Sequence, residues 1–271
     1  MAFIPQTIQK DYFMEVKGLI HIHSKYSDGD LSLPEIKEKA QKLGAKFVLM
    51  ADHMEYFKSQ KELNEMVDEC RKLSDNNFLI VPGFEVSPKR SYHIIVYNGR
   101  NFINHDPDFN DIIKQDFTEE QFLVLAHASH YSGKLPKELI DKLDGIEVWN
   151  AKYDSKYAPN IKSFRHLEET NLIAMAGLDA HSAAGLDKFW VEVELKELSI
   201  GEICGAFRNK RFKVRCGRKA IDINKPLGLL QKLYFAFINF IYVPVRTPLV
   251  FFAKLGLDYP PFLKKIFHKF F

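Results

Sequence analysis

The sequence predicts an α/β protein whose sheet is largely parallel, and three observations support this fold class. Short apolar runs of strand length alternate with segments whose apolar residues recur at helical spacing. Fragments rich in histidine and acidic residues follow several of the apolar runs. The length of 271 residues suits one large domain, or one domain with an appendage. Because the carboxyl ends of parallel strands open on one face, we expect the fragments to converge there.

The expected elements of the first half alternate between strand and helix. The first strand covers residues 18–22, and Ser32-Leu33-Pro34-Glu35 opens a helix that runs to about residue 43. Pro34 is compatible with that helix because its missing N–H falls in the first turn, where no intrahelical bond is lost. Further strands are expected at 47–50, 78–81 and 93–97, with a second helix over roughly 60–73.

The second half continues the alternation. Strands are expected at 122–126, 145–149, 172–176, 190–195 and 212–215. Helices are expected at 136–142, 157–170 and near 200–209. The sequence contains no internal repeat and no glycine-rich loop of the kind that cradles phosphate.

The charge is distributed unevenly along the chain, and the cysteine content indicates the compartment. Residues 226–271 contain six basic residues and one aspartate, so this tail carries +5 and residues 1–225 carry −2. The three cysteines are widely spaced and odd in number, which favours free thiols in a reducing compartment. Residues 1–18 show no secretory signal pattern. We therefore expect a cytoplasmic protein.

Six of the ten histidines belong to the acid-rich fragments. The fragments are His21-Ile22-His23 with Ser27-Asp28-Gly29, Ala51-Asp52-His53, Gly83-Phe84-Glu85 with His93, Ala126-His127, and Leu178-Asp179-Ala180-His181. Imidazoles and carboxylates gathered in this way are the ligands that divalent transition metals require. The pattern therefore indicates metal-assisted hydrolysis.

Strand geometry explains how the fragments could hold several ions. His21 and His23 are two residues apart, so both side chains are expected on one face of a strand, and Asp179 with His181 repeats this spacing. The Glu85 carboxylate can bridge two ions, as a single imidazole cannot. His93 and His127 would complete a second ion, with Asp28 and His53 completing a third. Two or three ions about 3.5–4 Å apart can clamp a phosphoryl group and activate water.

These fragments resemble, in order and spacing, the PHP (polymerase and histidinol phosphatase) superfamily across roughly residues 18–215. His21-Ile22-His23-Ser24 with Ser27-Asp28-Gly29 looks like the first motif of that family, and Asp52-His53 looks like the second. Ala126-His127 and Asp179-Ala180-His181 look like the third and fourth motifs. Ala128 departs from the proline that usually follows the third-motif histidine, which puts hydrogen bonding around the ligands in doubt but removes no ligand.

The resemblance implies a distorted (β/α)7 TIM-like barrel, and the PHP domain is expected at residues 1–220. Residues 226–271 lie beyond the resemblance, and their composition predicts a C-terminal aromatic, basic helical appendage. The resemblance also implies two or three divalent ions, namely Mn, Zn or Fe, with Mg as a further candidate. The implied ligands are His21, His23, Asp28, His53, Glu85, His93, His127, Asp179 and His181. The nucleophile would be a metal-bound water or hydroxide, so no catalytic side chain is expected beyond it.

Three side chains are candidates for binding substrate. Arg90 and Lys152 follow ligand-bearing strands and could meet a phosphate, although solvated surface charge explains both equally well. His130 lies three residues after His127, and an ordinary loop histidine is the alternative. Glu147 and Asn150 either orient the site or simply end a strand.

The tail at residues 226–271 holds twelve of the 36 aromatic residues, and residues 233–245 are apolar apart from Asn239. A spanning helix needs ~20 apolar residues, and this run is shorter. Apolar surface interrupted by lysine and arginine favours a peripheral or re-entrant anchor on an anionic membrane, here the inner face. The alternative is an arm that packs on the domain or forms a dimer interface.

The leading hypothesis is a metal-dependent phosphoesterase or phosphatase that hydrolyses a small-molecule or polymer phosphoester. A nuclease acting on DNA or RNA ends is the alternative within enzymes, and nucleic acid stays a candidate partner. The net negative charge of residues 1–225 and the lack of an aromatic–basic stripe outside the tail argue against a nuclease. A different class is a non-catalytic, metal-stabilised module that docks a partner through the tail, which predicts bound metal without turnover.

Overall fold

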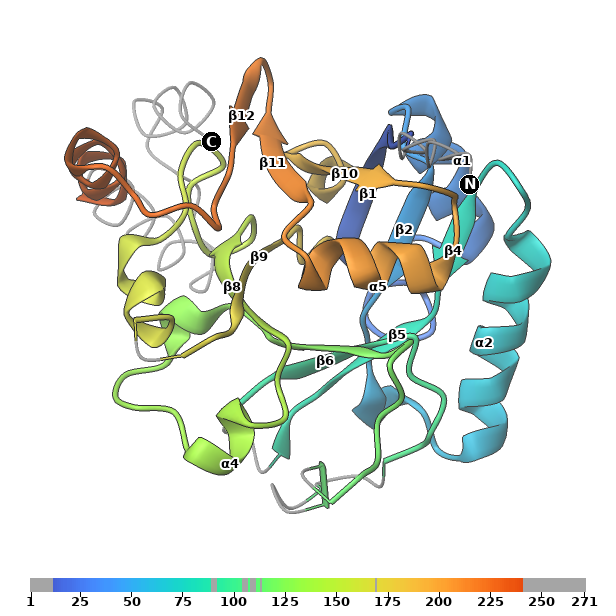
Figure 1. The fold of residues 1–271 in the computed structure, drawn as a ribbon. Helices are drawn as coiled ribbons and strands as arrows, with labels where there is room; N and C mark the ends of the chain where they lie inside the picture. Colours follow the sequence, from blue (N-terminus) through green and yellow to red (C-terminus); the bar gives the residue numbers. More distant parts are fainter. Residues whose placement is uncertain are drawn as a thin grey trace, which may run out of the picture.

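Two six-stranded sheets form the framework of the protein (Figure 1). The structure is a computed structural model that describes residues 12–88, 92–103, 107, 111–112, 114–168 and 170–240. In spatial order, the first sheet contains β12 (Lys219–Ile221), β11 (Phe212–Cys216), β10 (Trp190–Leu195), β1 (Met14–Ile22), β2 (Phe47–Met50) and β4 (Leu79–Val81). The second contains β3 (Asp52–His53), β5 (Gly83–Val86), β6 (Ile94–Tyr97), β7 (Phe122–Leu125), β8 (Gly145–Asn150) and β9 (Ile173–Gly177).

The sheets are mixed, so the expectation of a largely parallel sheet is wrong. The parallel pairs are β1–β2, β2–β4, β3–β5, β7–β8 and β8–β9. The antiparallel pairs, equal in number, are β1–β10, β10–β11, β11–β12, β5–β6 and β6–β7. Seven residues join Val86 to Ile94, and because a crossover helix needs a dozen or so, β6 has to return antiparallel to β5.

Three of the expected helices form within a residue or two of their predicted limits. They are α1 (Leu33–Lys42), α2 (Gln60–Leu73) and α5 (Ile200–Arg208). The Ser59 side chain accepts a hydrogen bond from the Glu62 N–H at 3.3 Å, and this N-cap fixes where α2 begins. The buried residues of these helices recur at helical spacing, as Leu63, Met66, Val67 and Cys70 do in α2.

Two expected helices are corrected by the structure. Only α4 (Lys137–Ile140) forms within 136–142. Residues 157–170 contain the 3₁₀ helix η4 (Ile161–His166) instead of an α-helix. Pro159 has no N–H, and the Asn160 side chain accepts from Lys162 N at 3.1 Å, so the helical turn cannot begin before residue 161. β3, β5 and β12 were not expected as strands of their own.

The end of β1 lies beside the segment that follows β9. Leu178 N–H donates to the Ile20 carbonyl at 2.9 Å, and His23 N–H donates to the Ala180 carbonyl at 3.0 Å. Ala180 N–H donates in turn to the His21 carbonyl at 3.1 Å. These hydrogen bonds bring the first and last histidine fragments together, although they lie near opposite ends of the domain sequence.

Residues 229–240 of the predicted tail are helical, and this tail helix lies at the left edge of Figure 1 in dark orange. Phe235 is buried, and the Asn239 amide bonds to Ile161 N and to the Pro159 carbonyl, each at 3.1 Å. Residues 241–271 of the tail lie outside the described residues. Among the residues that the structure describes, no helix is both long and apolar enough to cross a membrane.

Candidate metal centre

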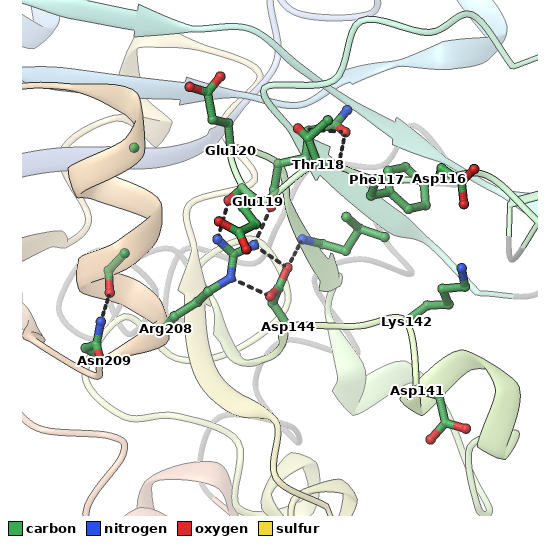
Figure 2. Close-up of a pocket in the computed structure, with 14 residues that line it drawn as sticks. Asp116, Phe117, Thr118, Glu119, Glu120, Asp141, Lys142, Asp144, Arg208 and Asn209 are labelled. Carbon is green, nitrogen blue, oxygen red and sulfur yellow. Dashed lines mark hydrogen bonds and ion pairs between the residues drawn. The ribbon is translucent and has the colours of Figure 1, made fainter.

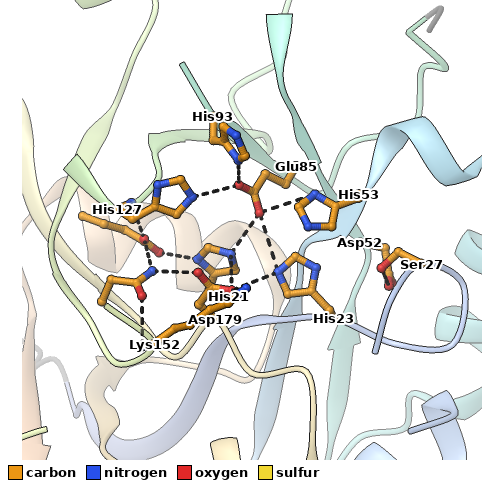
Figure 3. A network of polar contacts seen from close by, with 12 residues as sticks. His21, His23, Ser27, Asp52, His53, Glu85, His93, His127, Lys152 and Asp179 are labelled. Carbon is orange, nitrogen blue, oxygen red and sulfur yellow. Dashed lines mark hydrogen bonds and ion pairs between the residues drawn. The ribbon is translucent and has the colours of Figure 1, made fainter. Parts of the chain in front are cut away.

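The Glu85 carboxylate on β5 is surrounded by five of the predicted histidines (Figure 3). Its Oε2 atom lies 3.2 Å from His21 Nε2, 3.6 Å from His23 Nε2 and 3.9 Å from His53 Nδ1. Its Oε1 atom lies 3.1 Å from His127 Nε2 and also contacts His93 Nδ1. Burial disfavours a charged carboxylate, but the imidazoles outweigh burial and hold the pKa of Glu85 well below its usual range. Glu85 is therefore ionised at neutral pH.

A second group forms around Asp28, closer to solvent. Asp28 Oδ2 lies 3.2 Å from His181 Nε2 and 3.8 Å from His53 Nε2. Asp28 Oδ1 lies 3.7 Å from His23 Nδ1, and the His23 and His181 rings stack with centroids 4.0 Å apart. Asp28 itself is exposed, whereas His23 is fully buried. His23 therefore connects an inner, buried group to an outer, accessible one.

The predicted ligands form three overlapping groups in which all ligand-type atoms lie within 4.8 Å of one another. The groups are His23, Asp28, His53 and His181; His21, His23 and Glu85; and Glu85, His93 and His127. Asp179, the remaining predicted ligand, has its Oδ1 atom 3.6 Å from His23 Nε2 and 3.9 Å from His21 Nε2. The structure thus brings together all nine residues that the sequence indicated.

Several buried imidazole nitrogens of these groups have no hydrogen-bond partner. They are Nδ1 and Nε2 of His23, Nδ1 of His53 and Nδ1 of His127. Buried polar atoms are nearly always paired, so these unpaired nitrogens need an explanation. Coordination of divalent transition ions would use these lone pairs, and neutral imidazole with carboxylate is the donor set that such ions prefer. The residues present therefore fit a cluster of divalent metal ions.

Three of the nine residues adopt left-handed backbone conformations. The φ angles are 64° at His21, 32° at His127 and 48° at Asp179. The pairing of β1 with β2 shifts register between Ile20 and Ile22, around His21. His21 and His23 do meet, with ring centroids 5.1 Å apart, but regular strand alternation is the wrong reason for it. Non-glycine residues in this region store strain, typically at functional sites.

Glu147 and Asn150 on β8 orient this cluster instead of merely ending a strand. Glu147 Oε1 lies 2.7 Å from His21 Nδ1, and its Oε2 accepts from the His127 backbone N–H at 2.8 Å. Asn150 Nδ2 donates to Glu147 Oε2 at 3.0 Å and to Asp179 Oδ2 at 3.2 Å. All of these side chains are buried. Partners of this kind fix the orientation of metal ligands.

Asp52, which the sequence grouped with His53, supports the loop that carries Asp28. Its Oδ1 atom accepts from Ser24 N–H at 2.6 Å and from the Ser27 hydroxyl at 2.7 Å. Burial raises the pKa of Asp52 to about 6, while the hydrogen bonds from Ser24 and Ser27 act in the opposite direction. Sequence spacing gave no sign that Asp52 points away from the ligands.

Lys152 is one predicted substrate contact that the structure places at the cluster. Its Nζ atom lies 3.2 Å from Asp179 Oδ1 and 3.3 Å from His181 Nε2, and its side chain is 39% exposed. Burial opposes its charge, but the Asp179 carboxylate outweighs that effect and raises the pKa of Lys152 above its usual value. His130 is close as well, with its ring centroid 5.1 Å from that of His127. Arg90 lies outside the described residues.

The sequence did not identify Tyr131, whose hydroxyl contacts the backbone of a predicted ligand, as part of the site. The hydroxyl accepts from the backbone N–H of His93 at 2.8 Å, and burial raises the pKa of Tyr131 above its usual value, so the phenol stays protonated. Tyr131 directly follows the 3₁₀ helix η3 (Ala128–His130), and this short helix begins directly after His127. A loop tyrosine carries no spacing signal, so nothing in the sequence distinguishes it.

A cavity of about 680 Å³ lies at the amino-terminal ends of β7 and β8, where Gln121 and Asp144 line it, whereas His127 follows the carboxyl end of β7. Figure 2 shows residues that line this cavity. Its walls include the acidic side chains of Asp116, Glu119, Glu120, Asp141 and Asp144. The Arg208 guanidinium in the wall is paired, with Nε 2.9 Å from Asp144 Oδ1 and Nη1 donating to the Glu119 carbonyl. An acidic wall with a saturated arginine does not suit a phosphate, so the cluster around Glu85 is the better candidate site.

A mixed α/β domain with histidines and carboxylates gathered at strand ends is the class of protein that the fold and the site define. The model of the PHP domain matches residues 20–212, which is more than half of the chain, and the chain belongs to this family. The resemblance drawn from the histidine motifs is thereby confirmed.

Among curated proteins, the chain is 32% identical over 79 residues to the DNA polymerase/3'-5' exonuclease PolX of Bacillus subtilis (strain 168). This match covers 27% of the chain and 14% of PolX, so the chain spans only a small part of that relative.

Two solved structures share the fold. One is a two-domain protein from Bacteroides vulgatus ATCC 8482 containing a predicted PHP-like metal-dependent phosphoesterase, with TM-score 0.59 and 19% identity over 84% of this chain and 70% of that chain. The other is PsfC from Pseudomonas syringae PB-5123, with TM-score 0.56 and 16% identity over 84% of this chain and 97% of that chain. At these identities the likeness concerns the fold alone.

Proposed function

We propose that the protein hydrolyses phosphate esters with the help of two or three divalent metal ions held by the nine clustered residues. The observation that carries this proposal is the position of Glu85. Its two oxygens face two different sets of imidazoles, His21 with His23 on one side and His93 with His127 on the other. A buried, ionised carboxylate between two donor groups is suited to bridging adjacent ions.

Divalent ions at this cluster would supply Lewis acidity for a phosphoryl group and lower the pKa of a water nucleophile. The chain itself contributes orientation. Glu147 fixes the His21 ring and the His127 backbone, so two ligand positions depend on one carboxylate. No side-chain nucleophile is required by this arrangement.

Lys152 provides the binding role that a substrate phosphate needs. Its ammonium group stays charged beside Asp179 and remains partly exposed, so a phosphate oxygen can approach it from solvent. A charged amine next to the reacting phosphoryl group also stabilises negative charge that develops in the transition state. Replacing Lys152 with methionine should therefore raise KM and lower kcat together.

The family fold, a distorted seven-stranded barrel, is part of this proposal. It is supported by the hydrogen bonds that link the end of β1 to residues 178–180 and by the direct continuation of β2 into β3 through Ala51. A barrel would explain why ligands from six separate segments reach one cluster, since the carboxyl ends of its parallel strands open on one face.

The experiment is phosphate release by the purified full chain with Mn²⁺, over a panel of phosphomonoesters and phosphodiesters. Asp179→Ala is the inactivating variant, and Asp68→Ala on the exposed face of α2 is its matched control. We expect release by the wild type and by Asp68→Ala, and loss of at least about a hundredfold in Asp179→Ala. Bound metal without release from any substrate would contradict the proposal and favour a docking module.

The partial match to PolX gives one specific reason to retain a nuclease as the second candidate. PolX combines a DNA polymerase with a 3'-5' exonuclease, and the match covers 14% of its length. The same panel separates the candidates. A preference for single-stranded DNA or RNA ends over every phosphomonoester would favour the nuclease, and the reverse preference would favour the phosphatase.

A further inference from the structure

The tail helix, residues 229–240, turns its apolar side chains outward. Its exposed fractions are 73% at Leu229, 82% at Leu230, 58% at Leu233, 60% at Phe237 and 76% at Phe240. At 100° per residue these five positions fall within an arc of about 100°, and the half-exposed Tyr234 extends the arc to about 140°. We call this arc of six residues the outer face. Surface helices normally bury such a stripe.

The opposite side of the tail helix is fixed to the domain. Phe235 is 2% exposed, and Asn239 accepts from the Ile161 N–H while donating to the Pro159 carbonyl. Both positions lie roughly opposite the outer face on the helical wheel. A polar side chain thus faces the domain while the leucines and phenylalanines face away. Because two specific contacts set this orientation, the outer face is exposed by the fold itself.

A groove of about 640 Å³ lies between the domain and residues 223–227, which lead into the tail helix. Apolar residues line much of it, including Ile161, Phe164, Leu172, Ile223 and Leu227. Lys210, Lys225 and Lys232 also line it. None of the six outer-face residues lines this groove, which adds a second apolar area bordered by lysines beside the start of the tail helix. Exposed apolar surface rimmed by polar groups marks an interaction site.

The charge around the outer face is positive. From residue 217 to residue 240 the basic side chains are Arg218, Lys219, Lys225 and Lys232, and Asp222 is the one acid. Lys219 Nζ lies 5.2 Å from the ring centroid of Tyr234, so one of these charges lies directly at the outer face. Residues 217–240 thus carry a net +3, whereas residues 1–216 carry a net −4. Positive charge is therefore concentrated where the apolar surface is exposed.

We propose that the outer face of the tail helix binds the surface of a bilayer that contains anionic phospholipid, with the helix axis in the membrane plane. Leu229, Leu233 and Phe237 would enter the boundary between headgroups and acyl chains, and the lysines would meet lipid phosphates. Apolar burial and attraction to anionic lipid act together, as for other in-plane helices. With the helix axis in the membrane plane, all six side chains of the outer face would meet the lipid together.

The loop that joins this surface to the metal cluster is short. Lys152 and the Pro159–Ile161 contact belong to the same connection, between β8 and η4. A membrane bound to the outer face would lie on the far side of the tail helix from this connection, so the helix itself would stand between the membrane and the connection. This inference concerns binding and stands independently of the proposed phosphoesterase activity.

The test is flotation of the full chain with phosphatidylcholine vesicles, with and without phosphatidylglycerol. Leu233→Glu adds a charge to the outer face, and Gln231→Glu is its matched control, since it adds the same charge at an exposed position outside the face. We expect flotation only with the anionic vesicles, a fall in partitioning of about tenfold or more for Leu233→Glu, and a much smaller fall for Gln231→Glu. Lys232→Gln should cost roughly fivefold and make binding less sensitive to salt.

Thermal unfolding and light scattering accompany the flotation. Unchanged midpoints would show that the substitutions, all at exposed positions, leave the fold intact. The proposal is overturned if the wild type fails to float with anionic vesicles, or if Leu233→Glu floats as well as Gln231→Glu. A wild-type dimer that Leu233→Glu splits, without any flotation, would assign the face to a second copy of the chain instead.

Discussion

Glu147 and His21 are joined at 2.7 Å between Oε1 and Nδ1, both fully buried, and this pairing leaves the other nitrogen of His21 facing Glu85. The carboxylate thereby selects which nitrogen of His21 is offered to a metal. Its second oxygen also holds the backbone of His127. One side chain outside the predicted ligand set therefore controls two members of that set.

Replacing Glu147 with glutamine should weaken metal binding without removing a ligand. The amide keeps the shape but loses the charge that supports His21, so we expect Mn²⁺ affinity to fall about 10–100-fold. Competition with a fluorescent chelator measures the affinity directly. Glu197→Gln, at an exposed position, is the control and should bind like the wild type. Equal affinities in both variants would show that Glu147 does not position the ligands.

Gly177 marks a close approach between β9 and this pair. A Cβ atom at this position would lie 1.8 Å from Glu147 Oε1 and 2.9 Å from His21 Nδ1. Gly177→Ala must therefore displace the buried pair, and we expect a loss of several kcal/mol in the free energy of unfolding. Gly205→Ala in α5 meets nothing within 4 Å and should stabilise the protein by up to about 1 kcal/mol. Urea denaturation measures the change in the free energy of unfolding for both variants. A mild destabilisation by Gly177→Ala would contradict the close approach of Gly177 to Glu147 and His21.

The backbone at Asp179 is left-handed, with φ of 48°, and the strain of this conformation should lower the free energy of unfolding of the metal-free protein. With metal removed by chelator, Asp179→Gly should be more stable than Asp179→Ala by about 1 kcal/mol, because glycine adopts this conformation without strain. At Asp68 in α2 the order should reverse by a similar amount, since alanine favours a helix. The same order at both positions would argue against strain at the site.

Asp154 gives a dependence of stability on pH. Burial raises the pKa of Asp154 to about 6, above its usual value near 4, although Asn150 N–H and the Asn160 amide donate to it. The folded protein therefore binds this proton more tightly than the unfolded chain. Its contribution is fully present below about pH 4 and is lost as pH rises through about 6, by roughly 3 kcal/mol.

Asp154→Asn removes this ionisation. The free energy of unfolding of the wild type, relative to that of the variant, should therefore fall by roughly 3 kcal/mol between pH 4 and pH 7. Chemical denaturation at a series of pH values gives the difference. A constant difference across the range would mean that Asp154 has an ordinary pKa in the folded protein.

The sequence predicted which residues would meet. The prediction rests on histidines and acidic residues that follow apolar segments, so it does not depend on the exact bounds or direction of each strand. The sequence predicted neither the bulge at His21 nor the separate strand that carries Glu85, since a positive φ at a histidine and a four-residue strand have no periodic signal. Tyr131 could not be found because its contact with the His93 backbone depends on a loop conformation. The largely parallel sheet was wrong because periodicity reports strands without their direction.

Removal and return of metal tests the central claim most directly. The full chain is treated with chelator, dialysed, and assayed for phosphate release from the best substrate of the panel as Mn²⁺ is added back. We predict that chelation abolishes release, that Mn²⁺ restores it in the wild type and in Glu197→Gln, and that Glu85→Gln recovers less than about a hundredth of it. Release that persists without metal, or full recovery in Glu85→Gln, would contradict the assignment of this cluster as a metal-dependent phosphoesterase site.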